Sequence, residues 1–435
     1  MPTESPWRIR DFRTLFSANV LSVLGSNVSY VAVPMVAVIA LDAGPGQVGL
    51  LAALSTAAFL LIGLPAGAWV DRMRHRRVLI VAELCRGALL GSVPLAWWLD
   101  ALTFEHLCVV VLLDGVSTVF FDVTAQSTLP RLVGRDSLVP ANAALVSLSA
   151  AGSVTGRGAG GALVELLTAP VALAVSTVGY LASGLQLLRL KPTDKDAPAK
   201  VPPQGRLLTQ IGEGLRHVLR DAELRALALT GTLGNLGSVM INTMLPVLFA
   251  RELGLSAGLL GLYWAIGGIG IFVGARCARP LAARFGLGST IVRLNQWVAP
   301  AAVFLPLIDR GAWLWLAATA WSVFTFKTGV ANVLGVSLRQ RLTPGPLLGR
   351  MNATFRFMFT GSMAIGAALS GLIGQYVSLR AALWAGAACL ALSVLPVVLS
   401  PIRHRTTLTD AGYEPVRSQP RRSLREPSCD SSRLR

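Results

Sequence analysis

Charged residues are scarce in this chain. Of its 435 residues only 14% are Asp, Glu, Lys or Arg, whereas 53% are hydrophobic, and the mean hydropathy is +0.60. Water-soluble domains carry about a quarter charged residues, so a soluble domain is excluded. A bilayer-spanning helix needs roughly 20 apolar residues, and uncharged runs of that length recur along the chain. The sequence therefore predicts a polytopic helical membrane protein.

The residues that build metal centres, disulfides and nucleotide sites are few or scattered. The five Cys are odd in number and lack metal-binding spacing, and the four His form no ligand cluster. A GxxxxGK[ST] phosphate loop is missing, which excludes ATP hydrolysis by this chain. We therefore expect no metal, no cofactor and no enzyme activity. Lysine is also rare, with 4 Lys against 35 Arg, a bias that suggests a GC-rich genome such as that of an actinobacterium.

Apolar runs, some interrupted by single charges, divide the chain into twelve predicted spans. These are 14–41, 43–70, 78–99, 105–127, 141–165, 166–188, 226–250, 255–275, 289–308, 311–337, 357–379 and 381–402. On one side of the predicted membrane the connections and termini hold 32 Lys and Arg, against 3 on the other side. Because basic loops stay in the cytoplasm, both termini are predicted to be cytoplasmic, in a plasma-membrane protein. The net charge of +17 then belongs to the inner face and does not indicate nucleic-acid binding.

Composition shifts divide the chain into four parts. Residues 1–190 hold the first six spans, and residues 224–402 hold the last six. Between them, 191–223 is a Pro- and Lys-rich cytoplasmic linker followed by an amphipathic segment, which we expect to lie on the inner membrane surface. The polar, basic residues 403–435 are predicted to be a disordered cytoplasmic tail.

The two halves repeat each other. Residues 127–145 align with 337–355 at an offset of 210, with six identities. Asn27 aligns with Asn235 at 208, and Gly67 with Gly274 at 207. Such offsets indicate two parallel six-helix halves, an arrangement that places a transport site near the midplane between them.

The connection after the second span carries the sequence GAWVDRMRHRR, from Gly67 to Arg77. A glycine lets two helix ends approach closely, and an acid at a helix terminus can pair with Arg. This segment resembles the signature loop of the major facilitator superfamily. The resemblance implies that Gly67, Asp71 and Arg72 take part in conformational gating.

The fifth span contains glycines four residues apart, Gly152 and Gly156, followed by Gly161. This pattern resembles the antiporter motif GxxxGPxxGG of drug exporters, with Arg157 in place of the Pro. The resemblance implies a gating role for the three glycines. Close helix packing alone explains the same spacing.

The segment 120–142 (FFDVTAQSTLPRLVGRDSLVPAN) is similar to the macrolide-efflux and enterobactin-exporter branch of that superfamily, and the likeness extends from residue 7 to 404. The resemblance implies proton-coupled export of a small, often lipophilic compound.

Charges inside spans are costly and need a reason. Counting residues along the helices places Asp114 at the depth of Arg157, so we expect an Asp114–Arg157 ion pair, structural or functional. Asp114 or Asp122 is the predicted proton carrier.

Glu83 and Arg86, three residues apart, are expected to form a local structural ion pair near the inner boundary. Lys327 and Arg356 have no acid in the spans of their own half, and they must snorkel, face water or reach across the halves.

Polar side chains at helical spacing mark the first and seventh spans, as helix-packing contacts or as a cavity wall. The predicted substrate-binding residues are Asn27, Tyr30, Arg157, Asn235, Asn242 and Lys327.

The leading hypothesis is a secondary active exporter that moves a small hydrophobic drug or natural product by proton antiport with alternating access. Its expected partners are the substrate, protons and the lipid bilayer. An importer of a polar or anionic solute, using Arg157 and Lys327 as counter-charges, remains an alternative. A non-transporting membrane sensor or scaffold is the third hypothesis.

Overall fold

The computed structural model describes residues 5–70, 72–134, 137–190 and 207–404, and in these residues the chain is helical without a strand. The predicted all-α architecture is confirmed. The helices are α1 (Arg10–Met35), α2 (Pro45–Val70), α3 (His75–Trp98), α4 (Phe104–Val133), α5 (Leu138–Leu167), α6 (Ala169–Leu187), α7 (Leu207–Arg220), α8 (Ala222–Val247), α9 (Ala257–Phe285), α10 (Leu287–Ala302), α11 (Ala312–Leu342), α12 (Leu348–Tyr376), α13 (Leu379–Leu392) and α14 (Leu395–Val398).

Side-chain caps and glycines set several helix ends. The carboxylate of Asp221 accepts hydrogen bonds from two backbone N–H groups at the start of α8, and the Ser256 hydroxyl accepts one at the start of α9. Gly134 and Gly286, with φ of 71° and 81°, follow the last residues of α4 and α9. Short turns there reverse the chain, so consecutive long helices run antiparallel.

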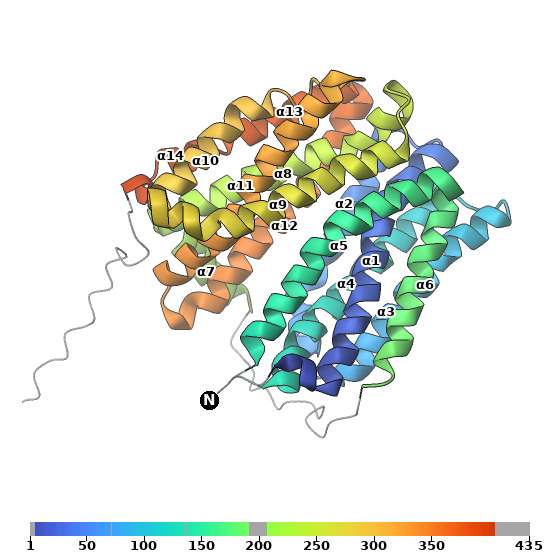
Figure 1. Cartoon of the computed structure of the whole chain (residues 1–435), viewed down its shortest axis with the longest axis horizontal. Coiled ribbons are helices and arrows are strands. Elements are labelled where there is room, and N and C mark those ends of the chain that lie inside the picture. Colours follow the sequence, from blue (N-terminus) through green and yellow to red (C-terminus); the bar gives the residue numbers. More distant parts are fainter. Residues whose placement is uncertain (1–4, 71, 135–136, 191–206, 405–435) are drawn as a thin grey trace, which may run out of the picture.

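The helices form two bundles, α1–α6 and α8–α14, coloured blue to green and yellow-green to red in Figure 1. α1 and α8 begin 212 residues apart, as do α2 and α9. Pro34 lies two residues before a π-helical segment, Val36–Ala40, and Pro246 two residues before its counterpart, Leu248–Glu252. The duplication into two parallel halves is therefore confirmed in detail.

The alignment of Asn27 with Asn235 is wrong. At the offset of 212 that the helix starts give, Asn27 corresponds to Val239 and Asn235 to Val23. The mistaken offset of 208 differs by four residues, about one helical turn, so it matched side chains on the same face.

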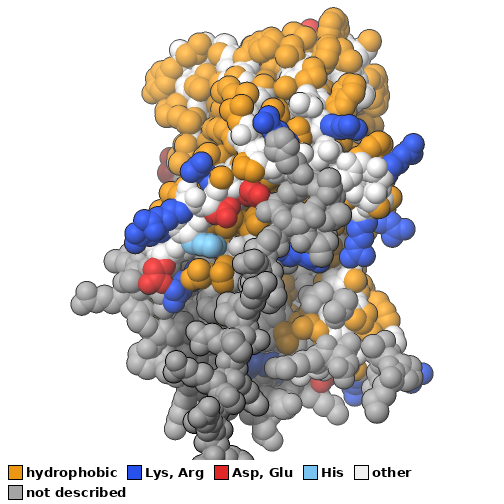
Figure 2. Space-filling view, turned by 90° about the vertical axis from the view of Figure 1, so that its left-hand side faces the viewer, with side chains coloured by type: hydrophobic (Ala, Val, Ile, Leu, Met, Phe, Trp, Pro, Cys, Tyr) orange, Lys and Arg blue, Asp and Glu red, His pale blue; other side chains and the backbone are white. Residues whose placement is uncertain are grey.

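Among the described residues, nine helices are long and apolar enough to cross a membrane, and α5, α10 and α11 complete the twelve-span fold. Large apolar side chains, among them Leu61, Val178, Trp297 and Ile365, are 57–71% exposed on the outer surface of the bundles. Such a surface requires lipid around it. Figure 2 shows Lys and Arg side chains gathered in a band below an apolar surface.

We call the end of the molecule near α7 and the α2–α3 turn the inner end, because the charge bias predicts it to be cytoplasmic; the opposite end is the outer end. The largest buried apolar cluster, which includes Val31 and Met244, joins both halves toward the outer end. Toward the inner end the buried clusters around Leu15 and around Leu338 each belong to one half. The buried apolar clusters are thus shared between the halves toward the outer end and confined to single halves toward the inner end.

Two glycine contacts close the outer end. A Cβ built on Gly161 of α5 would lie 2.8 Å from the Gly261 Cα of α9, and one on Gly371 of α12 would lie 2.8 Å from the Gly49 Cα of α2. Beside them, the Glu165 carboxylate accepts a hydrogen bond from the Gly258 N–H (3.0 Å). The Gln375 side-chain oxygen accepts one from the Gly46 N–H (3.3 Å). We call these the Glu165 latch (Gly161, Glu165, Gly258 and Gly261) and the Gln375 latch (Gly46, Gly49, Gly371 and Gln375).

The two latches are related by the duplication. Glu165 and Gln375 are 210 residues apart, as are Gly161 and Gly371, and Gly49 and Gly261 are 212 apart. One latch therefore has an ionisable side chain where the other has a neutral amide.

The amphipathic segment expected in the linker is helix α7. It packs against the inner end of α12, where Glu213 forms an ion pair with Arg350 and the Val218 side chain is fully buried. Leu215 and Leu219 remain 39% exposed, available to a membrane surface. The Pro- and Lys-rich part of the linker and the C-terminal tail beyond 404 lie outside the described residues.

Candidate functional site

A central cavity of about 390 Å³ lies between the two halves. The first half contributes residues of α1, α2, α3, α4 and α6, and the second half contributes residues of α8, α9 and α12. Most of its wall is apolar, and its charged side chains are Arg86 and Asp114. Concave, mostly apolar sites with a few polar groups are typical of small-molecule binding.

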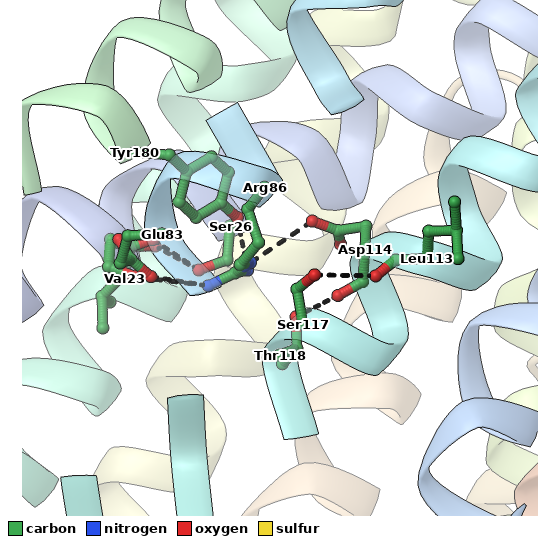
Figure 3. A network of polar contacts seen from close by, with 10 residues as sticks. Val23, Ser26, Glu83, Arg86, Leu113, Asp114, Ser117, Thr118 and Tyr180 are labelled. Carbon is green, nitrogen blue, oxygen red and sulfur yellow. Dashed lines mark hydrogen bonds and ion pairs between the residues drawn. The ribbon is translucent and has the colours of Figure 1, made fainter. Parts of the chain in front are cut away.

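Arg86 of α3 is the centre of a polar network (Figure 3). Its guanidinium lies 3.2 Å from the Glu83 carboxylate and 3.3 Å from that of Asp114 on α4. It also donates a hydrogen bond to the Tyr180 hydroxyl of α6 (2.6 Å) and stacks over that ring at 4.0 Å. The Ser22 hydroxyl of α1 donates to Glu83 (3.0 Å). Four helices of the first half therefore converge on one guanidinium.

Two carboxylates share this single cation. Arg86 and Glu83 are buried, with 5% and 0% of their side chains exposed, whereas the Asp114 side chain is 24% exposed and lines the cavity. If both acids are ionised, the network carries one surplus negative charge in a poorly solvated place. Of the two acids, Asp114 is the one that a proton in the cavity can reach.

The expected Asp114–Arg157 pair does not form. Asp114 is bound to Arg86, while the Arg157 guanidinium of α5 donates to the Asn27 side-chain oxygen (3.3 Å) and lies 4.3 Å over the Tyr30 ring. Depth arithmetic gives the height of a residue in the membrane but not the direction in which its side chain points. The Glu83–Arg86 pair does form, as expected, although as part of the larger network.

An aromatic contact bridges the halves at the cavity. Tyr30 of α1 packs edge-on against Trp264 of α9 with ring centroids 5.0 Å apart, and the Trp264 indole donates to Asn242 of α8 (2.7 Å). All three side chains line the central cavity. The structure thus brings together Tyr30 and Asn242 from the predicted binding set, and Asn27 and Arg157 adjoin them through Tyr30.

Lys327 and Asn235 lie in a separate pocket. This pocket of about 170 Å³ is lined by α8, α10, α11, α12 and α14 of the second half, and we call it the Lys327 pocket. Lys327 is 6% exposed, so it neither snorkels nor faces bulk water.

Asp122, the second predicted proton carrier, does not line either cavity. It lies within electrostatic reach of Arg86 and of Arg356 on α12, and the Arg356 guanidinium lies 4.0 Å over the Phe59 ring of α2. Arg356 therefore reaches across the halves, one of the three outcomes expected for it.

The predicted gating glycines occupy different places. Gly152 and Gly156 pack α5 onto Val23 and Asn27 of α1, within one half, whereas Gly161 belongs to the Glu165 latch. The close approach expected at Gly67 is absent among the described residues, because a Cβ built there meets nothing of them within 4 Å. A Cβ at Gly67 would therefore have open space in the described conformation. Arg72 is exposed in the α2–α3 turn, and Asp71 lies outside the described residues.

Sequence reasoning missed Tyr180, Trp264 and Glu165. Tyr180 and Trp264 read as ordinary aromatic residues of apolar spans, and their hydrogen bonds require a fold to be seen. Glu165 offered a signal: its distance of 210 residues to Gln375 equals the offset of the repeat.

The chain is similar to known transporters over most of its length. A family model described as transmembrane secretion effector, a major facilitator family, matches residues 2–424. The enterobactin exporter EntS of Shigella dysenteriae is 28% identical over 402 residues, covering 90% of this chain and 92% of EntS. EntS of Escherichia coli K12 is 29% identical over 404 residues with the same coverage.

Solved structures show the same fold. A bacterial homologue of the iron transporter ferroportin, in an inward-facing state, aligns with a TM-score of 0.72 at 17% identity, covering 90% of this chain and 98% of that one. The nucleoside transporter NupG aligns at 0.70 with 12% identity, covering 90% and 98%. Together with the duplicated bundles, the family match assigns the chain to the transmembrane secretion effector family of the major facilitator superfamily.

Proposed function

We propose that this protein is a secondary active exporter that moves a small hydrophobic compound out of the cell in exchange for protons. The observation that carries the proposal is that Asp114 lines the cavity between the halves while it shares Arg86 with Glu83. A surplus carboxylate at a cavity wall is a group that a proton can neutralise, and intramembrane acids of this kind commonly relay protons. Each proton that enters the cell supplies about 2.3 kcal/mol per 100 mV of membrane potential, in addition to the pH gradient.

Arg86 links the proton to the substrate site. With Asp114 ionised, the guanidinium is held between Glu83 and Asp114; with Asp114 protonated, Arg86 and Glu83 balance each other. The groups that face Asp114 are Arg86 and, through it, Glu83 and Tyr180, with Asp122 two helical turns away on α4. Proton gain from the outside and proton loss to the inside therefore change the charge of the cavity wall by one unit.

The apolar wall favours a substrate with a hydrophobic body, since the cavity presents leucine, valine, methionine and aromatic side chains from both halves. Outward movement is favoured by the relatives, which are named as exporters of enterobactin.

Alternating access is proposed as the mechanism. The described conformation is closed at the two latches, and toward the inner end its buried apolar clusters each belong to one half, an arrangement that suits a carrier loading from the cytoplasm. The halves then rock so that the inner ends meet and the latches part. This assignment requires both termini to be cytoplasmic, as the positive-inside bias predicts.

Vesicles that contain the purified protein test the proposal, with radiolabelled erythromycin and 2-naphthoate as probes. An imposed pH gradient is expected to drive uphill accumulation of at least one probe by the wild type. Asp114→Asn is expected to lose the pH-driven accumulation about tenfold or more while it still exchanges labelled for unlabelled probe. Asp122→Asn, the matched control on the same helix, does not line the cavity and is expected to keep pH-driven transport. Flux that ignores the gradient in the wild type, or that depends on Asp122 and not on Asp114, contradicts the proposal.

Uptake of an anionic solute is the second candidate, and the buried cation Lys327 favours it. Transport measured in vesicles of known orientation distinguishes the exporter from the importer. An exporter accumulates the probe only in inverted vesicles with an acidic lumen, whereas an importer accumulates it in right-side-out vesicles with acid outside.

A further inference from the structure

The Lys327 pocket holds an uncompensated positive charge. The Lys327 ammonium lies 5.0 Å from the Phe324 ring centroid, and within the described part of the chain it has no hydrogen bond and no ion pair. Nζ lies 3.8 Å from the position that a Cβ on Gly234 would take, so the missing side chain at Gly234 leaves room for it. A buried charge without a partner is strongly unfavourable. Ionisable side chains that are retained inside the membrane usually mark a functional site.

The rest of the pocket is also basic and has free donors. Arg339, three turns along α11, lines the same pocket, and its buried Nε has no hydrogen-bond partner among the described residues. The Thr230 hydroxyl of α8 lines the pocket and is likewise buried without a partner. No Asp or Glu is among the described residues that line it. The free donors and the two cations all suit a negatively charged oxygen group.

The duplication explains how this pocket differs from the first half. At the offset of 212 that relates α3 to α10, the acid Glu83 corresponds to the neutral Asn295, which lines the Lys327 pocket. Arg86 corresponds to Val298, so the guanidinium network has no copy in the second half. One half therefore has a surplus carboxylate and the other a surplus ammonium.

The pocket adjoins the central cavity along one helix. Asn235 and Ser238 of α8 line the Lys327 pocket, and Val239 and Asn242 line the cavity. Residues at this spacing share one face of a helix, and Asn242 is about one turn beyond Ser238. A ligand whose apolar body fills the cavity and whose charged end reaches Lys327 would therefore lie along this face of α8.

We infer that the Lys327 pocket binds the anionic end of the transported compound, a carboxylate or an acidic phenol carried on a hydrophobic body. This inference rests on the proposed export function and narrows its substrate class. The proton and the anionic group then bind in different halves, Asp114 holding the first and Lys327 the second.

Chemical labelling of the wild type gives a test that does not depend on transport. The chain has four lysines, and the other three, Lys191, Lys195 and Lys200, provide an internal reference in separate peptides. Purified protein in nanodiscs is acylated with an amine-reactive reagent, and the labelled peptides are quantified by mass spectrometry. 2-Naphthoate is expected to slow acylation of Lys327 several-fold without changing that of the reference lysines, whereas the uncharged 2-naphthamide leaves Lys327 unprotected. Equal protection by the acid and the amide, or none by the acid, overturns the inference.

Binding to variants gives the second arm. Lys327→Met keeps the length of the side chain and removes its charge, and it is expected to weaken 2-naphthoate binding about tenfold or more. Lys327→Arg is expected to retain most of the affinity, and Arg339→Gln to lose a smaller part. Binding of 2-naphthamide stays unchanged in all three variants, which also reports that they are folded. Unchanged affinity of Lys327→Met for the acid contradicts the inference.

The two proposals fail in different ways. If Lys327→Met still exports an uncharged probe against its gradient and the wild type shows no preference for the acid, the pocket assignment fails while the export function stands. If Lys327 governs binding of the acid but no pH gradient moves it, the pocket assignment stands and proton-coupled export fails.

Discussion

At the scale of single residues, Arg86 determines the behaviour of the site. One guanidinium contacts two carboxylates and a tyrosine hydroxyl, and it is almost fully buried. Glu83 has no access to the cavity, whereas Asp114 does. The two acids compete for one cation, so a change in either one alters the charge that the other experiences.

Glu83→Gln is expected to shift the pH profile of transport to lower pH. Without the neighbouring carboxylate, Arg86 forms an ion pair with Asp114 alone. The ionised form of Asp114 is then favoured, and a lower pH is needed to protonate it. We expect a displacement of about one pH unit in the midpoint of the profile. Initial rates in vesicles between pH 5 and 8 measure it. A shift to higher pH, or an unchanged profile, means that Glu83 does not compete with Asp114 for Arg86.

Arg86→Gln is expected to destabilise the protein by about 3–5 kcal/mol, because it leaves the buried Glu83 and the partly buried Asp114 without their cation. The matched control is Arg72→Gln in the exposed α2–α3 turn, which is expected to change stability by less than about 0.5 kcal/mol. Adding Glu83→Gln to Arg86→Gln removes one of the orphaned acids and restores part of the loss. Unfolding in detergent, followed by tryptophan fluorescence, compares the four proteins; equal stability of Arg86→Gln and the wild type contradicts the network.

Much of this site could be predicted from the sequence, and the limits are physical. The presence of Asp114 in a span was enough to mark it, since intramembrane acids are rare. Its partner was predicted wrongly because depth along the membrane normal fixes only one coordinate. Arg86 was assigned to a local pair because it lies three residues from Glu83 on one helix. Its reach to α4 and α6 depends on how the helices pack.

At the scale of elements, the two latches define the closed outer end. Each pairs a glycine contact between α-helices of opposite halves with a side chain that caps the first turn of a helix, α9 or α2. A carboxylate near a helix N-terminus gains about 0.3–1 kcal/mol from the helix dipole, and a neutral amide gains less. The Glu165 latch is therefore expected to be the stronger one at neutral pH.

Gly161→Ala is expected to open the outer end. The new Cβ would lie 2.5 Å from the Ala257 carbonyl oxygen and 2.8 Å from the Gly261 Cα, which are backbone atoms that cannot move aside cheaply. Gly67→Ala is the matched control, because a Cβ there has open space. In a cysteine-free background with Asn242→Cys at the cavity wall, an impermeant thiol reagent added outside is expected to label Gly161→Ala several-fold faster. Equal labelling of both variants contradicts the latch.

Exchange of the two latch side chains tests the role of charge. Glu165→Gln removes the carboxylate and keeps a hydrogen-bond acceptor, and it is expected to raise outside labelling of the same cysteine about two- to fivefold, as the loss of 0.3–1 kcal/mol implies. Gln375→Glu supplies a carboxylate to the second latch and is expected to lower labelling. If neither substitution changes the labelling rate, the charge of these caps has no part in closure.

At the scale of the whole molecule, the duplication produces two bundles with different charge. The hydropathy pattern predicted the twelve spans and the two halves, because bilayer thickness sets helix length and burial sets composition. The register of the repeat was harder to predict from the sequence. Asn27 and Asn235 are both asparagines, but their positions in the two halves differ by about one helical turn. The separation of Lys327 from the central cavity was not predictable, since it depends on which side of α11 faces α8. The surplus acid of the first half and the surplus cation of the second became visible only once the halves were aligned by their helix starts.

Proton release on substrate binding tests the central claim most directly. Purified protein in weakly buffered detergent solution receives erythromycin or 2-naphthoate, whichever the vesicles transport, and a pH-sensitive dye records protons. The wild type is expected to release about one proton per bound molecule, Asp122→Asn the same amount, and Asp114→Asn none. Release from Asp114→Asn equal to that of the wild type would contradict the assignment of Asp114 as the proton carrier.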